Sequence, residues 1–100
     1  MATLREVQDR AWRNKLDKGF NTTDVPLEFG LLYGEIGEAF DAWRKATGKH
    51  GEELADAAIF LVALAEMTGV DLQAEVERKL AVNEARVYDC LPNGTHVKAS

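Results

Sequence analysis

The sequence predicts an all-α fold, a small up-and-down bundle of four helices. Apolar residues recur at helical spacing in four segments, and no segment alternates convincingly as a strand would. Capping residues, Pro or Gly stand at the expected ends of these segments. The 100 residues, 46% hydrophobic and 29% charged, are enough for one domain and too apolar for a disordered chain.

The first helix runs from Thr3 to about Lys18. Thr3 and Glu6 have the spacing of a capping box, in which a hydroxyl and a carboxylate satisfy backbone N–H groups of the first turn. Its apolar face consists of Leu4, Val7, Ala11, Trp12 and Leu16. Residues 19–23, Gly-Phe-Asn-Thr-Thr, form a loop.

The second helix starts after Asp24, an expected N-cap, with Pro26 in its first turn, where the missing N–H costs nothing. It continues to about Ala46 and stops at Gly48. The third helix spans about His50–Thr68 and ends at Gly69. Because these connections are short, we expect successive helices to be antiparallel neighbours.

The fourth helix is capped by Asp71 and runs to about Asp89, where Pro92 ends it. Residues 91–100 have no periodicity, so the sequence predicts a helical domain of residues 1–90 followed by a flexible tail of residues 91–100.

Two features predict that the protein is a homo-oligomer. Residues 57–65 are apolar on every side of the third helix, and three other helices of a monomer can hardly enclose such a helix. Gly30, Gly34 and Gly37 interrupt the second helix, which makes sense where backbones approach closely. The alternative is a monomer with a tight core.

Charge and cysteine content restrict the partners and the compartment. The net charge is −5, whereas a protein that grips a nucleic-acid backbone usually has a basic face, so we expect no nucleic-acid partner. No apolar run reaches the roughly 18 residues of a membrane span. The first residues lack the apolar core of a signal peptide, and Cys90 stands alone, which favours a reducing, cytoplasmic location.

Carboxylates interrupt two apolar helix faces. On the second helix, one face contains Leu31, Glu35, Glu38 and Ala42. On the third helix, one face contains Glu53, Asp56, Phe60, Ala63 and Met67. Because the two helices form a hairpin, the acidic pairs can face each other.

Four carboxylates in an apolar setting repel one another and favour protons or a cation. No cluster of Lys or Arg lies nearby in the sequence to neutralise them. Mg²⁺ prefers oxygen ligands, so Glu35, Glu38, Glu53 and Asp56 are a candidate Mg²⁺ site, with Mn²⁺ as a possible substitute. Iron is disfavoured because neither pair includes a His at the Glu-x-x-His spacing. The alternative is that each Glu-x-x-Glu or Glu-x-x-Asp pair is a solvated helix face.

The fourth helix adds a complementary set of polar side chains. Lys79, Asn83 and Arg86 share one face, where they could contact phosphate oxygens that a metal leaves uncovered. Taken alone, such a set of polar residues is more often a solvent-exposed helix face without a ligand.

These motifs together resemble the MazG-like family of all-α nucleoside triphosphate pyrophosphohydrolases. The resemblance rests on Glu35-Ile36-Gly37-Glu38, on Glu53-Leu54-Ala55-Asp56, and on the series Lys79, Asn83 and Arg86. It covers roughly residues 27–86 and implies Mg²⁺ held by the four acids. It also implies hydrolysis of a nucleoside triphosphate to the monophosphate and pyrophosphate, as a house-cleaning activity, by a homodimer or homotetramer. Glu35 or Glu38 is expected to orient the attacking water.

One departure from the family pattern is Gly34, which stands where relatives have the first Glu of Glu-Glu-x-x-Glu. Two alternatives therefore remain: a non-catalytic module that binds a nucleotide or a partner, and an enzyme resembling phosphoribosyl-ATP pyrophosphatase. Trp12, Lys18 and Asn21, together with Gln8, lie where relatives gather base and phosphate contacts, although Trp12 is better explained as a core residue than as a platform for a base.

Overall fold

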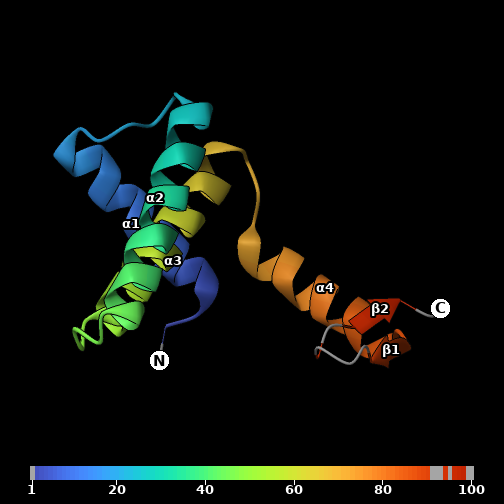
Figure 1. Cartoon of the computed structure of the whole chain (residues 1–100). Coiled ribbons are helices and arrows are strands. Elements are labelled where there is room, and N and C mark those ends of the chain that lie inside the picture. The colour runs from blue at the N-terminus through green and yellow to red at the C-terminus, as the bar shows by residue number, and fades with distance from the viewer. Residues whose placement is uncertain (1, 91–93, 95, 99–100) are drawn as a thin grey trace.

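The computed structural model describes residues 2–90, 94 and 96–98. Four helices account for most of the chain: α1 (Leu4–Lys18), α2 (Val25–Arg44), α3 (His50–Met67) and α4 (Leu72–Ala85) (Figure 1). Two short strands follow, β1 (Tyr88–Cys90) and β2 (His96–Lys98). The predicted all-α class is confirmed, with helix starts within one or two residues of those expected.

The predicted caps explain where the helices begin and end. The backbone N–H of Glu6 donates to Thr3 Oγ1 (3.1 Å), and that of Thr3 donates to Glu6 Oε1 (3.2 Å), which completes the capping box. Asp24 accepts from the backbone N–H of Leu27, and Asp71 accepts in the same way at the start of α4. Gly69 follows α3 with φ of +73°, a left-handed conformation that favours glycine.

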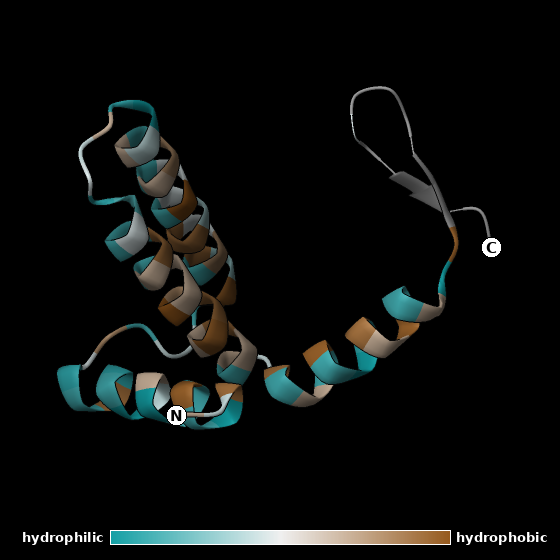
Figure 2. Ribbon diagram, turned by 90° about the horizontal axis from the view of Figure 1, so that it is seen from below, coloured by the Kyte–Doolittle hydropathy of each residue, from teal (hydrophilic) through white to brown (hydrophobic). Residues whose placement is uncertain are grey.

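The hairpin of α2 and α3 is the centre of the fold, and α1 lies across α3 (Figures 1 and 2). Leu32 of α2 packs with Ala57 and Leu64 of α3, and the partly buried Val25 and Phe60 extend this core. Residues 62–65 of α3 are all buried. This hairpin fixes the relative positions of the acidic side chains.

The packing of α4 differs from the predicted closed bundle. In one copy of the chain α4 packs mainly against α1, and both ribbon views show it diverging from the α2–α3 hairpin (Figures 1 and 2). No residue of α4 is buried. A single copy therefore forms a three-helix unit from which α4 extends.

Hydrogen bonds at Gln8 fix the direction of α4. This side chain is fully buried; its Nε2 donates to Glu66 Oε1 (2.9 Å) and to the Val70 carbonyl (2.8 Å), and its Oε1 accepts from the Leu72 N–H (3.2 Å). The backbone N–H of Arg5 also donates to Gln73 Oε1 (2.8 Å). Gln8 thus fastens the α3–α4 turn to α1 rather than contacting a base or phosphate.

The end of the chain departs from the sequence prediction. The fourth helix ends at Ala85 rather than near Asp89, because the backbone of Arg86 is extended (φ −82°, ψ 150°). The prediction of no strand was wrong for residues 88–90 and 96–98, which pair antiparallel, with Tyr88 opposite Lys98. The remainder of the predicted tail, residues 91–93, 95, 99 and 100, lies outside the described residues, so its flexibility stays a prediction.

Much apolar surface is uncovered in one copy of the chain. A stripe of five large side chains along α2 is exposed: Phe29, Tyr33, Ile36, Phe40 and Trp43. A Cβ placed on Gly30, Gly34 or Gly37 would meet nothing within 4 Å. Hence no close backbone approach at these glycines occurs within the described chain. None of the described helices combines the length and apolar character needed to cross a membrane.

Candidate metal centre

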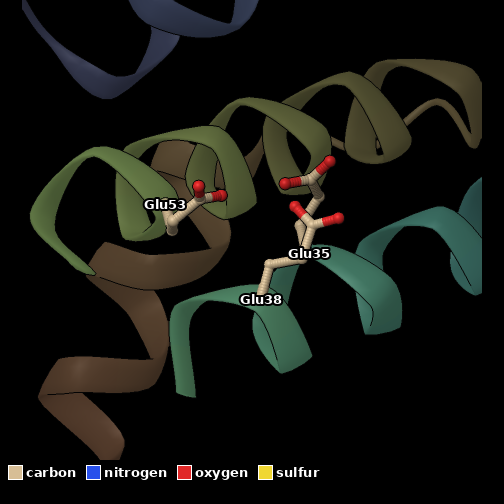
Figure 3. A group of neighbouring side chains, drawn as sticks. All are labelled: Glu35, Glu38 and Glu53. Atoms are coloured by element: carbon tan, nitrogen blue, oxygen red, sulfur yellow. The ribbon is translucent and has the colours of Figure 1, made fainter. Parts of the chain in front are cut away.

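Three carboxylates meet between the two helices of the hairpin. Glu35 and Glu38 project from α2, Glu53 projects from α3, and one carboxylate oxygen of each lies within 4.8 Å of the others (Figure 3). The i, i+3 spacing places the first two on one side of α2, and the hairpin brings Glu53 opposite them. Oxygens at this separation can coordinate one ion.

Glu35 belongs to the buried stripe of α2. That stripe is Glu28, Leu32, Glu35 and Ala39, rather than the predicted series through Leu31 and Ala42. Leu31 is 41% exposed. The Oε2 atom of Glu35 is buried and has no hydrogen-bond partner among the described residues. An unpaired buried carboxylate oxygen is costly, so this atom calls for a proton or a cation.

The electrostatics of the cluster support that conclusion. Burial raises the pKa of Glu35, and the neighbouring charges of Glu38, Asp56 and Glu53 raise it further. Burial likewise raises the pKa of Glu53, with Glu38 and Asp56 adding to the effect. The described residues contain no ion pair between these acids and a Lys or Arg. The donor set, carboxylate oxygens only, fits a hard divalent cation such as Mg²⁺ or Mn²⁺.

Asp56, the fourth predicted ligand, lies at the edge of the cluster. Its side chain is exposed, and it is not one of the three residues whose oxygens lie within 4.8 Å of one another. It is nevertheless close enough for its charge to raise the pKa of both Glu35 and Glu53.

Two lysines near the acids did not enter the sequence reasoning, which noted only that no cluster of Lys or Arg lies nearby in the sequence. A hollow of about 360 Å³ is lined by Glu38, Asp41, Ala42, Lys45, Thr47, Lys49 and Glu53. Lys45 and Lys49 flank the α2–α3 loop, so they approach the acids without pairing with them in the described structure. The sequence could have indicated this, because Lys45 follows Glu38 by two turns and Lys49 precedes Glu53 by one turn.

A second cavity begins one helical turn from the acids, on the other side of the cluster. It encloses about 310 Å³ and is lined by Ala11, Lys15, Phe20, Asn21, Glu28, Leu31, Ile59, Phe60 and Ala63. Leu31 precedes Glu35 by one turn of α2, and Phe60 follows Asp56 by one turn of α3. The cavity thus has mostly apolar walls and one polar end.

The polar end is a buried ion pair that the sequence reasoning did not identify. Lys15 Nζ lies 3.1 Å from Oε1 and 3.0 Å from Oε2 of Glu28, and both side chains are buried. Asn21 Nδ2 donates to Glu28 Oε1 (3.2 Å) and to the Asp24 carbonyl (2.8 Å). The available signal was that Glu28 precedes Glu35 by two turns on the same face of α2.

The other predicted substrate contacts are dispersed. Asn21 lines the apolar cavity, whereas the half-buried Trp12 and the exposed Lys18 line neither hollow. Lys79 and Asn83 lie one turn apart on α4, and Arg86, which directly follows the helix, donates from Nη1 to Asn83 Oδ1 (3.4 Å). Since α4 diverges from the hairpin, these three do not join the acids of their own chain (Figure 1).

Known proteins provide two comparisons. The chain matches no protein-family model. It is 46% identical over 44 residues to a dATP/dGTP diphosphohydrolase of Salmonella phage PMBT28, a stretch that is 44% of this chain and 15% of that relative. The chain therefore spans about 15% of the length of that curated relative.

The second comparison covers both chains completely. A solved structure, described as a cyanophage S-2L MazG-like pyrophosphohydrolase bound to dGDP and three catalytic Mn²⁺ ions per active site, superposes with a TM-score of 0.70 and 28% sequence identity. The chain therefore has the fold of a MazG-like pyrophosphohydrolase over its full length, and the local identity to the phage diphosphohydrolase supports a relationship to that family.

Proposed function

We propose that this protein is a Mg²⁺-dependent nucleotide pyrophosphohydrolase that converts a (deoxy)nucleoside triphosphate to the monophosphate and pyrophosphate. One observation carries the proposal: Glu35, Glu38 and Glu53 present oxygens within 4.8 Å of one another, and a buried Glu35 oxygen has no partner among the described residues. Carboxylates arranged in this way are suited to holding Mg²⁺ against phosphate oxygens.

The acids have distinct expected roles. Glu35, Glu38 and Glu53 would hold the ion, with Asp56 joining from the rim. When bound, Mg²⁺ or Mn²⁺ supplies positive charge that offsets the charge developing on the leaving pyrophosphate. A Glu35 or Glu38 oxygen accepts a hydrogen bond from the attacking water and orients it. The water oxygen then bonds to the α-phosphorus while the bond from that phosphorus to the bridging oxygen breaks. Pyrophosphate leaves with the bridging oxygen, and the water gives up a proton to the carboxylate that orients it.

The two hollows indicate which way the substrate would lie along the hairpin, with its base in one and its phosphates toward the other. The apolar cavity suits a base, with Phe20 and Phe60 as apolar walls and the Lys15–Glu28 pair at its polar end. The hollow at the other side of the acids offers Lys45 and Lys49 to the phosphates. The named relatives act on or bind purine deoxynucleotides, which favours a purine deoxynucleotide here, consistent with house-cleaning of unwanted nucleotides in the cytoplasm.

We also propose a homo-oligomer, a dimer or a tetramer. The exposed stripe of α2 is accompanied by Leu54 and Leu61 of α3, which are 55% and 44% exposed. Soluble monomers seldom leave so much contiguous apolar surface uncovered. Light scattering at low micromolar concentration tests this, because a mass near the 11.1 kDa of one chain would contradict it.

The deciding assay is pyrophosphate release from a panel of ribo- and deoxynucleoside triphosphates, with and without Mg²⁺. We expect Mg²⁺-dependent release, greatest with a purine deoxynucleotide. A non-catalytic binding module is the second candidate, and Gly34 at the position of a family Glu favours it. Nucleotide binding without release under any metal would support that module and contradict the hydrolase.

A further inference from the structure

Three zones follow one another along the α2–α3 hairpin (Figure 1). On α2, Leu31 borders the apolar cavity and Glu38 belongs to the acidic cluster, whereas Lys45 borders the hollow at the α2–α3 loop. Helix α3 has the same zones, from Phe60 at the cavity to Lys49 at the hollow. Lys45 lies two turns beyond Glu38, about 10 Å along the helix axis. A nucleotide with its base in the cavity and its α-phosphate at the acids therefore has its outer phosphates at the loop.

The α2–α3 loop is held in one shape by its own hydrogen bonds. The Thr47 hydroxyl donates to the Ala42 carbonyl (3.4 Å) and accepts from the backbone N–H of Lys49 (3.1 Å). Ala46 has φ of +54°, a left-handed conformation that is uncommon for a residue other than glycine. Such a conformation persists only where the surrounding structure enforces it. The fold thus fixes the backbone from which Lys45 and Lys49 project.

Lys45 and Lys49 have charges that the described residues leave unpaired. Neither lysine forms an ion pair in the part of the chain that the structure describes, although both border the same hollow as two acids of the cluster. Asp41, the third acid of this hollow, is already paired with Arg44 (3.1 Å). Two unpaired ammonium groups beside a hollow of about 360 Å³ suit an anion with more than one negative charge.

Pyrophosphate is such an anion, and it is the leaving group of the proposed reaction. When the bond from the α-phosphorus to the bridging oxygen breaks, that oxygen and its negative charge stay with the β-phosphate. Cations placed where this charge develops stabilise the transition state more than the bound substrate. We propose that the loop hollow is a subsite for the leaving pyrophosphate. Lys45 and Lys49 bind the β- and γ-phosphates there, so the enzyme selects triphosphates over diphosphates. This inference rests on the proposed hydrolase function.

The test compares the wild type with the double variant Lys45→Ala/Lys49→Ala in the presence of Mg²⁺. Hydrolysis of dGTP and of dGDP is measured for both proteins, and calorimetry measures the binding of inorganic pyrophosphate. Losing one hydrogen bond to a charged group costs about 10-fold or more in affinity. We expect the ratio of kcat/KM for dGTP to kcat/KM for dGDP to fall by about 10-fold or more, because only the triphosphate fills the subsite. The affinity for pyrophosphate is expected to fall by a similar factor.

Two control variants separate a local effect from a general one. Lys45→Arg/Lys49→Arg keeps both charges and is expected to retain the preference for dGTP and the affinity for pyrophosphate. Arg13→Ala changes the net charge as each single lysine substitution does, but Arg13 is exposed on α1 and borders neither hollow. It is expected to behave as the wild type.

The possible failures are distinguishable. Circular dichroism checks the fold of each variant, and the single variants Lys45→Gln and Lys49→Gln replace the double variant if it does not fold. If the wild type hydrolyses dGTP but the folded lysine variants keep its substrate ratio and its affinity for pyrophosphate, the subsite alone is overturned. A wild type that hydrolyses no nucleotide overturns the hydrolase proposal, and the pyrophosphate subsite with it.

Discussion

Two regions of the molecule contain buried carboxylate groups, and the two regions differ in what surrounds these charges. Where α1 meets α2, Glu28 is fully buried and is paired with Lys15 and Asn21. Two turns further along the same face of α2, Glu35 has a buried oxygen with no partner among the described residues and has acids as neighbours. In the first region the protein itself supplies a cation, with Lys15 Nζ 3.0 Å from Glu28 Oε2. In the second, no Lys or Arg of the described residues forms an ion pair with the acids.

Under the proposed function, this difference separates a structural acid, Glu28, from a metal-binding one, Glu35. A buried charge that is paired and hydrogen-bonded can stabilise the folded chain or fix a register. A cluster of like charges lowers the stability of the metal-free protein. Proteins retain such destabilising clusters at sites where they bind a ligand. Substitutions in the two regions should therefore change stability in opposite directions.

The largest expected effect is the loss of stability in Glu28→Gln. Removing one partner leaves the Lys15 charge buried and uncompensated, which typically costs about 3–5 kcal/mol. We expect a matching decrease in the free energy of unfolding, measured with urea in the absence of metal. The double variant Lys15→Met/Glu28→Leu is the control and is expected to recover most of the loss. A Glu28→Gln protein as stable as wild type would contradict the structural role of the pair.

The next effect is on catalysis. Glu38→Gln and Asp56→Asn are each expected to lower pyrophosphate release by more than about 100-fold, because losing even an outer-shell partner of a metal costs about 10–100-fold. Without metal, both variants are expected to melt at or above the wild-type temperature, since each removes a charge from a repelling cluster.

The neighbouring Glu52→Gln is the matched control for these two variants, because Glu52 is exposed on the first turn of α3 and lies outside the cluster. It is expected to retain activity. If Glu38→Gln unfolded the protein, or if Glu52→Gln were equally inactive, the cluster would be structural rather than functional.

The third effect is stabilisation by Mg²⁺. A ligand that binds only the folded state adds about 2.7 kcal/mol at 100 times its dissociation constant. The pKa values of Glu35 and Glu53 are raised above their ordinary 4.5. Protonation of these two carboxyl groups therefore stabilises the folded, metal-free protein below that pH. This contribution to the free energy of unfolding is lost as the pH rises through the raised pKa values. Protons and Mg²⁺ compete for the same oxygens.

The Mg²⁺-induced increase in melting temperature is therefore expected to be larger at pH 8 than at pH 5. Thermal melts at several Mg²⁺ concentrations measure it, with Glu38→Gln as the variant expected to show a much smaller shift. An increase of equal size at both pH values would mean that Mg²⁺ binds elsewhere.

Local signals were sufficient to predict the helices and the acidic pairs. The capping box at Thr3, the N-caps Asp24 and Asp71, and the stop at Gly69 depend on neighbouring residues only, and the structure has all of them. The grouping of Glu35, Glu38 and Glu53 followed from helical spacing and one short hairpin.

Features that depend on tertiary packing could not be predicted in the same way. The direction of α4 is set by Gln8, whose bonds to Val70 and Leu72 join segments far apart in the sequence. The pairing of Lys15 with Glu28 likewise depends on how α1 crosses the hairpin. The inner face of α2 was misplaced by one residue because Leu31, an apolar residue, borders a cavity rather than the core.

The smallest expected effect concerns Gly34, which adjoins the unpaired acids. A Cβ at Gly34 meets nothing within 4 Å, so Gly34→Ala is expected to stabilise the protein by about 0.5–1 kcal/mol through helix propensity. Gly34→Glu adds a carboxylate one turn before Glu38, and such like-charge pairs cost about 0.2–0.5 kcal/mol. We therefore expect Gly34→Glu to be less stable than Gly34→Ala without metal and to gain more from Mg²⁺. Urea unfolding with and without Mg²⁺ measures both differences. If Gly34→Ala were destabilised instead, another copy of the chain would have to approach the backbone at that position.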